Sequence, residues 1–205
     1  MLNPGHQFSF QRILDHVLKR INLSPDEQDY FCSLLTVRNL LPRQYLVQAG
    51  DICKYESFVE KGFLRSFYFD PDGNDYTLHF AMEDWWISDS TSFIKSAPAT
   101  RNIIALERCT VIQLDKISLG ELYLKIPAFE RFWRIMNENA CMAQDQRILN
   151  SITMTGAERY EALLKKYPGI EQRLPQKHIA SYLGISPVFL SNIRRRKPVS
   201  TRKLN

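Results

Sequence analysis

The sequence predicts an α+β fold with N-terminal helices, a β jelly-roll barrel, a long central helix and a C-terminal helix-turn-helix domain. Three observations lead to this prediction. Short runs rich in aromatic and β-branched residues alternate with turn signals between residues 40 and 114, which is typical of barrels and jelly rolls. Residues 128–152 contain neither proline nor glycine and repeat apolar side chains every three or four positions. Residues 174–197 read as two short helices joined by a tight turn.

The N-terminal elements are two predicted helices. Residues 10–21 place their apolar side chains on one face of a helix. Ser24 then supplies an N-cap, Pro25 suits the first helical position, and Glu27 lies in the first turn. We expect this second helix to run to about Leu35.

Five strand-like runs follow, and turn signals at residues 49–51, 61–62 and 70–73 separate several of them. The expected strands are Leu40–Val47, Phe58–Glu60, Phe63–Phe69, Tyr76–Phe80 and Thr110–Leu114. Short strands at this spacing favour a barrel or jelly roll.

The central segment predicts a long helix that begins after Pro127. Its apolar positions are spaced like short heptads, which indicates a two-helix dimer contact, and packing on its own barrel alone is the alternative. The predicted dimer interface is Phe129, Phe132, Trp133, Met136, Ala140, Ala143 and Arg147. The expected domains are residues 1–125 for the N-terminal helices and barrel, 126–154 for the central helix and 155–205 for the C-terminal part.

The C-terminal part begins with a capping-box pattern, Thr155 followed by Glu158. Farther on, Gly184 is expected to end one helix in a left-handed conformation, and Ser186 with Pro187 to begin the next. This arrangement matches the helix-turn-helix module, whose second helix enters the DNA major groove.

Charge supports a nucleic-acid partner for this part of the chain. Residues 170–205 contain eight lysines and arginines against one glutamate, a net charge of +7, whereas the whole chain carries +5. A basic excess at one end is expected of a surface that contacts phosphates. The predicted DNA-binding residues are Gln176, Lys177, Ser186, Val188, Phe189, Ser191, Asn192, Arg194, Arg195 and Arg196.

Composition sets limits on the other function classes. The 205 residues are 44% hydrophobic and 24% charged, without an apolar run long enough to span a membrane or a signal-peptide pattern at the start, so we expect a cytoplasmic protein. Four isolated cysteines and four scattered histidines show no metal-ligand spacing. No nucleophile-and-base set stands out either. We therefore expect no enzyme activity, no catalytic residues, no metal and no cofactor.

The order of these parts resembles the Crp/Fnr family of bacterial transcription regulators. The segments that resemble the family are Gln48-Ala-Gly-Asp51 and Val59-Glu-Lys-Gly62 in barrel turns, Pro71-Asp-Gly73 in a hairpin, and Ile179-Ala-Ser-Tyr-Leu-Gly-Ile-Ser186 in the helix-turn-helix. The resemblance implies a cyclic-nucleotide-binding-like barrel and a homodimer on two-fold symmetric operators. It also implies RNA polymerase and a small-molecule effector as candidate partners.

The chain departs from the family's cyclic-nucleotide cassette. The family's ribose-binding Gly-Glu pair aligns with Ser88 and Asp89, and its phosphate-binding Arg aligns with Ala99. Loss of that charged contact is worth ~1.5–3 kcal/mol, so cyclic AMP is not expected to bind in the usual mode. The resemblance places the modified effector pocket at Trp86, Ser88, Asp89, Ala99, Thr100, Arg101 and Met142.

The second helix of the helix-turn-helix also departs from the family. Pro187 and Val188 stand where relatives often carry Arg and Glu, so readout is expected from Asn192 on adenine and from Val188 or Phe189 on thymine methyl groups. A second function stays open, in which the barrel is a sensor and the C-terminal helices contact a protein partner.

Overall fold

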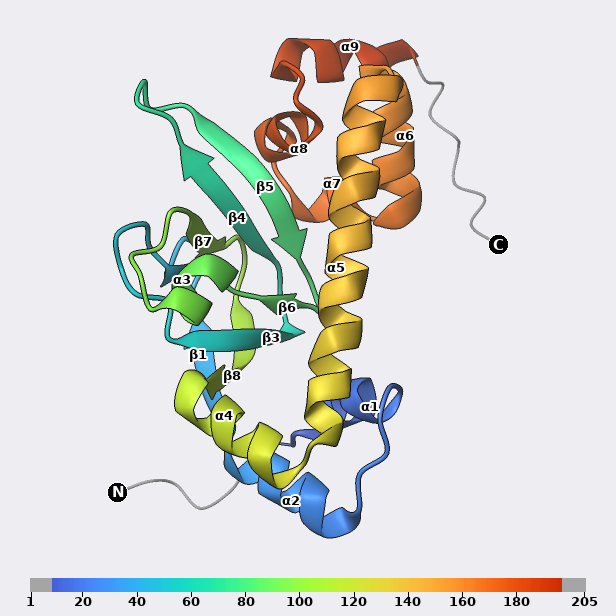
Figure 1. The fold of residues 1–205 in the computed structure, drawn as a ribbon. Helices are drawn as coiled ribbons and strands as arrows, with labels where there is room; N and C mark the ends of the chain where they lie inside the picture. The colour runs from blue at the N-terminus through green and yellow to red at the C-terminus, as the bar shows by residue number, and fades with distance from the viewer. Residues whose placement is uncertain (1–8, 197–205) are drawn as a thin grey trace. The chain divides into compact units, whose positions relative to one another are not determined.

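The structure, a computed structural model, describes residues 9–196 (Figure 1). These residues form two compact units that share one long helix, α5 (Ala128–Thr153). The first unit contains residues up to 68 together with 79–140, and the second contains residues 69–78 together with those from 141 onward. The chain passes from one unit to the other after residues 68, 78 and 140, and the last of these points lies inside α5, which the predicted division treats as a part of its own.

Two four-stranded sheets form the barrel. Their strand orders are β1-β8-β3-β6 and β2-β7-β4-β5. The strands are β1 (Thr36–Leu40), β2 (Tyr45–Val47), β3 (Tyr55–Lys61), β4 (Leu64–Phe69), β5 (Asp75–Ala81), β6 (Trp86–Ile87), β7 (Asn102–Ala105) and β8 (Cys109–Asp115). Neighbours that are distant in sequence, such as the antiparallel pair β1 and β8, are typical of a jelly roll, so the predicted barrel class is confirmed.

The barrel closes over apolar side chains that point inward from both sheets. Val59 of β3, Leu64 of β4, Ile103 of β7 and Val111 of β8 have no exposed surface. Alternation along a strand places one side chain in two on this inner face. The turn between β3 and β4 requires Gly62, because its φ is +106° and a Cβ would lie 2.8 Å from the Cα of Cys109.

A second apolar core joins the sheet to the helices of the first unit. These helices are α1 (Gln11–Leu18), α2 (Pro25–Ser33), α3 (Ser90–Lys95), α4 (Lys116–Lys125) and the first half of α5. Figure 1 shows α1, α2 and α4 gathered beside the start of α5. The predicted Ser24 cap is confirmed, because Ser24 Oγ accepts from the Glu27 N–H at 3.3 Å and the Glu27 carboxylate accepts from the Ser24 N–H at 2.7 Å.

Four short helices follow α5 in the second unit. They are α6 (Gly156–Lys166), α7 (Ile170–Arg173), α8 (Gln176–Leu183) and α9 (Pro187–Arg196). The capping box of Thr155 and Glu158 is confirmed, and Gly184 ends α8 with a φ of 65°. Their shared core is Tyr160, Leu163, Ile170, Leu174, Ile179, Ala180, Leu183, Leu190 and Ile193.

Several local predictions were wrong in extent. The run Leu40–Val47 is not one strand: it contains the end of β1, a turn, and β2. In the turn, Gln44 bonds to Leu41 through both backbone and side chain, and Leu41 is 56% exposed. Leu41 is therefore exposed in a turn, at a position where the prediction expected a continuous paired strand. The second helix also ends at Ser33, two residues before the expected end.

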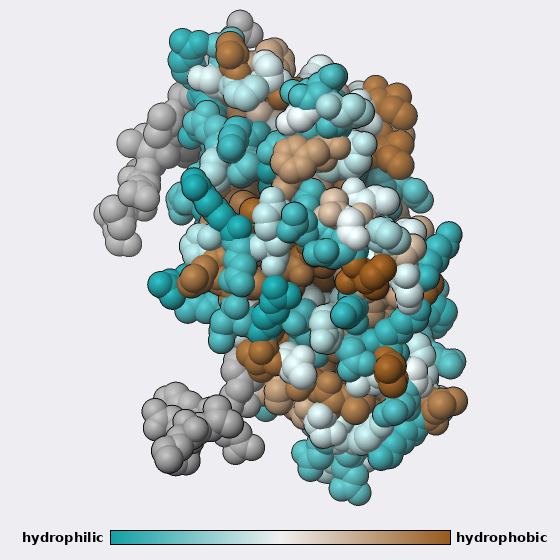
Figure 2. Space-filling model, turned by 90° about the vertical axis from the view of Figure 1, so that its left-hand side faces the viewer, coloured by the Kyte–Doolittle hydropathy of each residue, from teal (hydrophilic) through white to brown (hydrophobic). Residues whose placement is uncertain are grey.

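Within residues 9–196, no helix is both long and apolar enough to cross a bilayer. The described histidines, cysteines and acids form no group of three that could hold a metal ion. On the face drawn in Figure 2, hydrophobic side chains of the described residues are scattered among hydrophilic ones.

Candidate functional site

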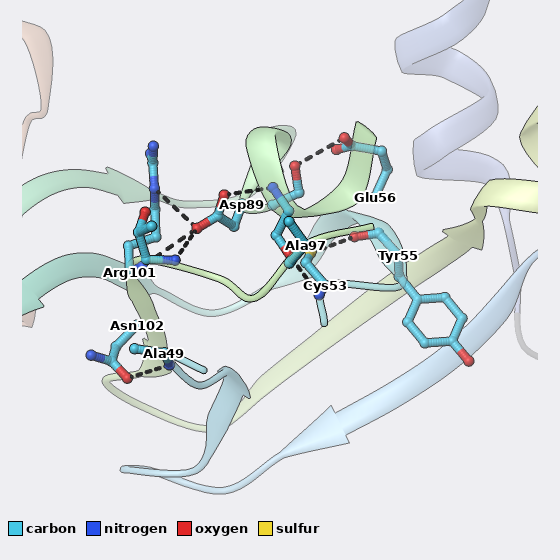
Figure 3. Close-up of polar contacts among 11 residues, drawn as sticks. Ala49, Cys53, Tyr55, Glu56, Asp89, Ala97, Arg101 and Asn102 are labelled. Atoms are coloured by element: carbon cyan, nitrogen blue, oxygen red, sulfur yellow. Dashed lines mark hydrogen bonds and ion pairs between the residues drawn. The ribbon is translucent and has the colours of Figure 1, made fainter. Parts of the chain in front are cut away.

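The carboxylate of Asp89 lies at the centre of the predicted effector site (Figure 3). Asp89 precedes α3 and has no exposed surface. One carboxylate oxygen accepts from the Ser92 N–H at 3.1 Å and thereby caps α3. The other accepts from the N–H groups of Thr100 and Arg101, at 3.1 and 3.4 Å. The Arg101 Nε lies 3.5 Å from the same oxygen, so one buried carboxylate meets three backbone amides and a cation.

The segment that carries Ala99 and Thr100 is also bonded from its other side. The Ala99 N–H donates to the Asp51 carbonyl at 2.8 Å, and the Ala99 carbonyl accepts from the Gly50 N–H at 2.8 Å. Next along the chain, the Asn102 side chain accepts from the Ala49 N–H at 3.0 Å (Figure 3). Each backbone N–H from residue 99 to 101 therefore has an acceptor within the protein.

A second acid, the half-buried Glu56, lies near this segment. Ser88 donates to Glu56 of β3 at 2.9 Å. Loss of hydration inside the unit raises the pKa of Glu56 to about 7, and the hydrogen bond from Ser88 opposes part of that rise. Trp86 of β6 is half-buried and packs edge-on against Trp133, with ring centroids 4.8 Å apart.

The structure brings most of the predicted effector residues together. Ser88, Asp89 and Ala99 are buried, Arg101 is half-buried, and Thr100 is exposed. Met142 belongs to the second unit and is 60% exposed, so its role beside the barrel stays a prediction. A cavity of about 180 Å³ in the first unit is lined by other residues, among them Arg38.

Sequence reasoning missed two features of this site. Glu56 was not singled out, and Asp89 was placed in the pocket without its role as a cap. A weak signal for the cap was present, because Asp is among the residues preferred at the N-cap of a helix. The contacts with Thr100 and Arg101 carry no such local signal, because they are 11 and 12 residues away.

The predicted DNA-binding residues lie along α8 and α9. Gln176, Lys177, Ser186, Val188, Phe189 and Arg195 are exposed, whereas Ser191, Asn192 and Arg194 are half-buried. Arg196 ends α9, and its side chain lies outside the described residues. Ser186 Oγ accepts from the Phe189 N–H at 3.1 Å, so the predicted cap of α9 is confirmed.

Three of these side chains have partners within the second unit. Arg194 lies 3.0 Å from the Glu171 carboxylate of α7. Arg195 donates to the side-chain oxygen of Asn192, one turn earlier on α9. The ring of Phe189 rests on Gly156, where an added Cβ would lie only 2.8 Å from the ring.

The predicted dimer residues of α5 fall into three groups. Phe129 and Phe132 are buried in the core of the first unit, and Trp133 and Met136 pack against that core. Ala140 and Ala143 are exposed. Arg147 is half-buried in the second unit and donates to the carbonyl groups of Thr77, Leu78 and Tyr182. In a single chain, Phe129, Phe132 and Arg147 thus already have intramolecular contacts.

Comparison with known proteins agrees with this fold. The cyclic nucleotide-binding domain family model matches residues 37–125. Among curated protein sequences, none matches the chain significantly.

Solved structures are similar over most of the chain. FixK2 from Bradyrhizobium japonicum has a TM-score of 0.70 at 15% identity, covering 79% of this chain and 83% of that one. The c-di-GMP responsive global regulator CLP from Xanthomonas campestris has a TM-score of 0.67 at 14% identity, covering 84% and 91%. The catabolite activator protein of Thermus thermophilus has a TM-score of 0.55 at 18% identity, covering 88% and 85%.

Sequence identities this low show a shared fold alone. The family match extends from β1 to the end of α4 and includes Asp89 and Ala99, which lie before and after α3. Residues 37–125 therefore match the cyclic nucleotide-binding domain family, and the chain around them has a fold similar to those of FixK2 and CLP.

Proposed function

We propose that the chain is a DNA-binding transcription regulator in which α8 and α9 act as a helix-turn-helix. The observation that carries the proposal is the outer surface of this helix pair. Leu183, Leu190 and Ile193 are turned into the core, which leaves Lys177, Val188 and Arg195 exposed. Neither helix contains an Asp or a Glu. A cationic surface without carboxylates suits a polyanion, because each phosphate contact releases a condensed counterion.

The side chains of α9 suggest separate roles. Val188, 70% exposed in the first turn, is placed to meet a thymine methyl group. Asn192 lies one turn farther along, and the guanidinium of Arg195 holds its side-chain oxygen. We assign base reading to Asn192 and orientation of its amide to Arg195. Phe189 is assigned mainly to packing, because its ring rests on Gly156.

A homodimer is the second part of the proposal. The Crp/Fnr resemblance implies two copies on a two-fold symmetric operator, with half-sites about 34 Å apart. The second half of α5 supports such a contact, because Met142, Ile148, Leu149 and Ile152 are 52–77% exposed on this helix. Seven-residue spacing between Met142 and Leu149 is that of a short two-helix contact.

The test starts from an operator selected out of random duplex DNA by the purified protein. Fluorescence anisotropy on this operator and on random DNA then compares three variants across a salt series. Asn192→Ala is expected to cost about 1–3 kcal/mol on the operator and little on random DNA. Lys177→Ala is expected to weaken both alike and to lower the salt slope by about one unit. Lys165→Ala, an exposed cation on α6, is the matched control and should change neither.

Two results would count against the proposal. One is that selection from random duplex DNA enriches no sequence and that binding to random duplex DNA does not depend on salt. This result would favour the alternative in which α8 and α9 contact a protein. Operator binding that survives Asn192→Ala unchanged would move base reading away from this face of α9.

A further inference from the structure

The contacts of Asp89 describe an anion site that already holds an anion. The site consists of the Thr100 and Arg101 N–H groups, which donate to one carboxylate oxygen, and the Arg101 guanidinium, whose Nε lies 3.5 Å from the same oxygen as an ion pair. The side chain of Asp89 is only 1% exposed, so water does not share this charge. A buried carboxylate is stable only where donors of this kind surround it.

We infer that Asp89 is a built-in anion that fixes the ligand specificity of the barrel by occupying the place of an anionic ligand. The domain family that matches residues 37–125 is described by cyclic nucleotide binding, and a cyclic nucleotide carries a phosphate anion. In this chain the backbone N–H groups of residues 99–101 all donate to acceptors within the protein, so none of them is left for a phosphate. The barrel therefore holds its 97–102 segment in place without an effector and rejects cyclic nucleotides.

Charge strengthens the exclusion. A phosphate brought to this segment would face the buried Asp89 carboxylate, and a like charge at short range in a poorly hydrated site is strongly unfavourable. Arg101, the cation within residues 97–102, is already paired with that carboxylate. Ala99, which is buried at 5% exposure, supplies no charge.

The opposite side of the segment leaves little room for adjustment. Ala99 is bonded through both N–H and carbonyl to the loop at residues 50 and 51. Ser92 Oγ accepts from the Cys53 N–H at 2.8 Å and donates to the Ala97 carbonyl (Figure 3). The 97–102 segment is therefore held between this loop and Asp89. Removing the Asp89 carboxylate should leave a cavity that the surrounding residues do not fill.

The experiment is thermal unfolding of the full chain with added anions. Asp89→Ala is expected to lower the Tm by several degrees. Formate, which has the size of the deleted carboxylate, should restore part of the loss in a saturable manner when titrated against chloride of equal ionic strength. Cyclic AMP and cyclic GMP should leave the wild-type Tm unchanged, whereas a ligand at ~100 times its Kd would raise it by roughly 5–10 °C.

Asp115→Ala is the matched control. Asp115 caps α4 by accepting from the Ile117 and Ser118 N–H groups at 2.9 and 3.0 Å, but it is only half-buried. Water can reach those amides, so its loss should lower the Tm without rescue by formate. If Asp89→Ala does not fold, Asp89→Asn tests the inference in its place. Asparagine keeps the shape of the side chain but loses its charge, so this variant is expected to be less stable than wild type.

Three outcomes would overturn the inference: a saturable rise of the wild-type Tm with cyclic AMP, a folded Asp89→Ala that responds to formate no more than wild type, or an Asp89→Asn variant as stable as wild type. DNA binding is not measured in this experiment. Failure here and failure of the proposed DNA-binding function are therefore separate results.

Discussion

Two titratable side chains inside the first unit have pKa values shifted in opposite senses. Burial lowers the pKa of His16 to about 4, with the nearby Arg20 adding to the effect, and burial raises the pKa of Glu56 to about 7. His16 is 6% exposed and packs against the rings of Phe58 and Phe132. Each group favours its neutral form in the folded state, so each destabilises the fold at the pH where it must ionise.

The pH dependence of unfolding follows from these signs. The protonated Glu56 stabilises the fold below its unfolded pKa of 4.5, and this contribution is lost as the pH rises to about 7. The neutral His16 stabilises the fold above its unfolded pKa of 6.5, and this contribution is lost as the pH falls to about 4. Between pH 4.5 and 6.5 the contribution of Glu56 falls with pH while that of His16 rises. The free energy of unfolding of the wild type should therefore change little across this range.

Glu56→Gln should separate the two groups. Glutamine keeps the acceptor for Ser88 but does not ionise, so the variant should match wild type near pH 4.5 and exceed its free energy of unfolding by up to about 3 kcal/mol at pH 8. Between pH 4 and 6.5 its stability should rise, because His16 then acts alone. Urea unfolding at a series of pH values measures both effects. Glu121→Gln, an exposed glutamate of α4, should keep the wild-type profile, and a Glu56→Gln profile parallel to wild type would disprove the assignment.

At the scale of elements, polar contacts join the start of β5 to α8 in the second unit. Ser181 Oγ accepts from the Thr77 N–H at 2.8 Å and donates to the Asp75 carbonyl at 3.0 Å. Arg147 of α5 donates to carbonyls of both elements and stacks on Tyr182, with its guanidinium carbon 4.3 Å from the ring centroid. One arginine thus connects three elements that are far apart in sequence.

Arg147→Ala should therefore lower the free energy of unfolding by about 2–4 kcal/mol, because it leaves half-buried carbonyls without a charged donor. The free energy of unfolding of Arg147→Lys should lie between those of wild type and Arg147→Ala. An ammonium keeps the charge but does not present the planar fork of donors that reaches several carbonyls. Arg131→Ala, on an exposed part of the same helix, should change stability by no more than about 0.5 kcal/mol. Equal urea midpoints for the Arg147→Ala and Arg131→Ala variants would contradict this role.

The elements that the sequence predicts well are those with local signals. The caps at Ser24, Thr155 and Ser186 depend on contacts three residues apart, so the sequence contains both partners. The short strands β6 and β7 were missed, because their pairing partners lie about 30–60 residues away and the runs are too short to show alternation. The candidate site divides in the same way: most of its members were predicted, but Glu56 was not, and the contacts around Asp89 depend on the closed barrel.

The role of α5 shows another limit of sequence reasoning. Helical spacing indicates that one face is apolar, but it does not distinguish a face packed on the same chain from one that meets a second copy. Part of the predicted interface packs on the same chain: Phe129 and Phe132 are core residues, and Arg147 binds the backbone of its own unit. Which face meets a second copy stays a prediction, and the structure offers a specific alternative to the first one.

At the scale of the whole molecule, a two-fold symmetric operator requires a second copy, and the exposed apolar side chains of α5 are the best candidates for the contact. Met142, Ile148, Leu149 and Ile152 all lie in the second unit, so their grouping does not depend on how the two units are placed. At 100° per residue they share one side of the helix, and Ala143 lies roughly 160° from the centre of that side.

The double variant Ile148→Glu with Ile152→Glu should therefore be monomeric and bind the operator much more weakly, because four glutamates would meet across the two helices. Ala143→Glu adds the same charge on the opposite side and should stay dimeric, even though Ala143 belongs to the interface predicted from sequence. Sedimentation at tens of micromolar, well above the Kd of roughly 1 μM or less typical of a stable dimer, separates the two cases. If Ala143→Glu is monomeric and the double variant is dimeric, the interface predicted from the sequence is favoured instead. If the wild-type chain is itself monomeric, the dimer is no longer part of the proposal.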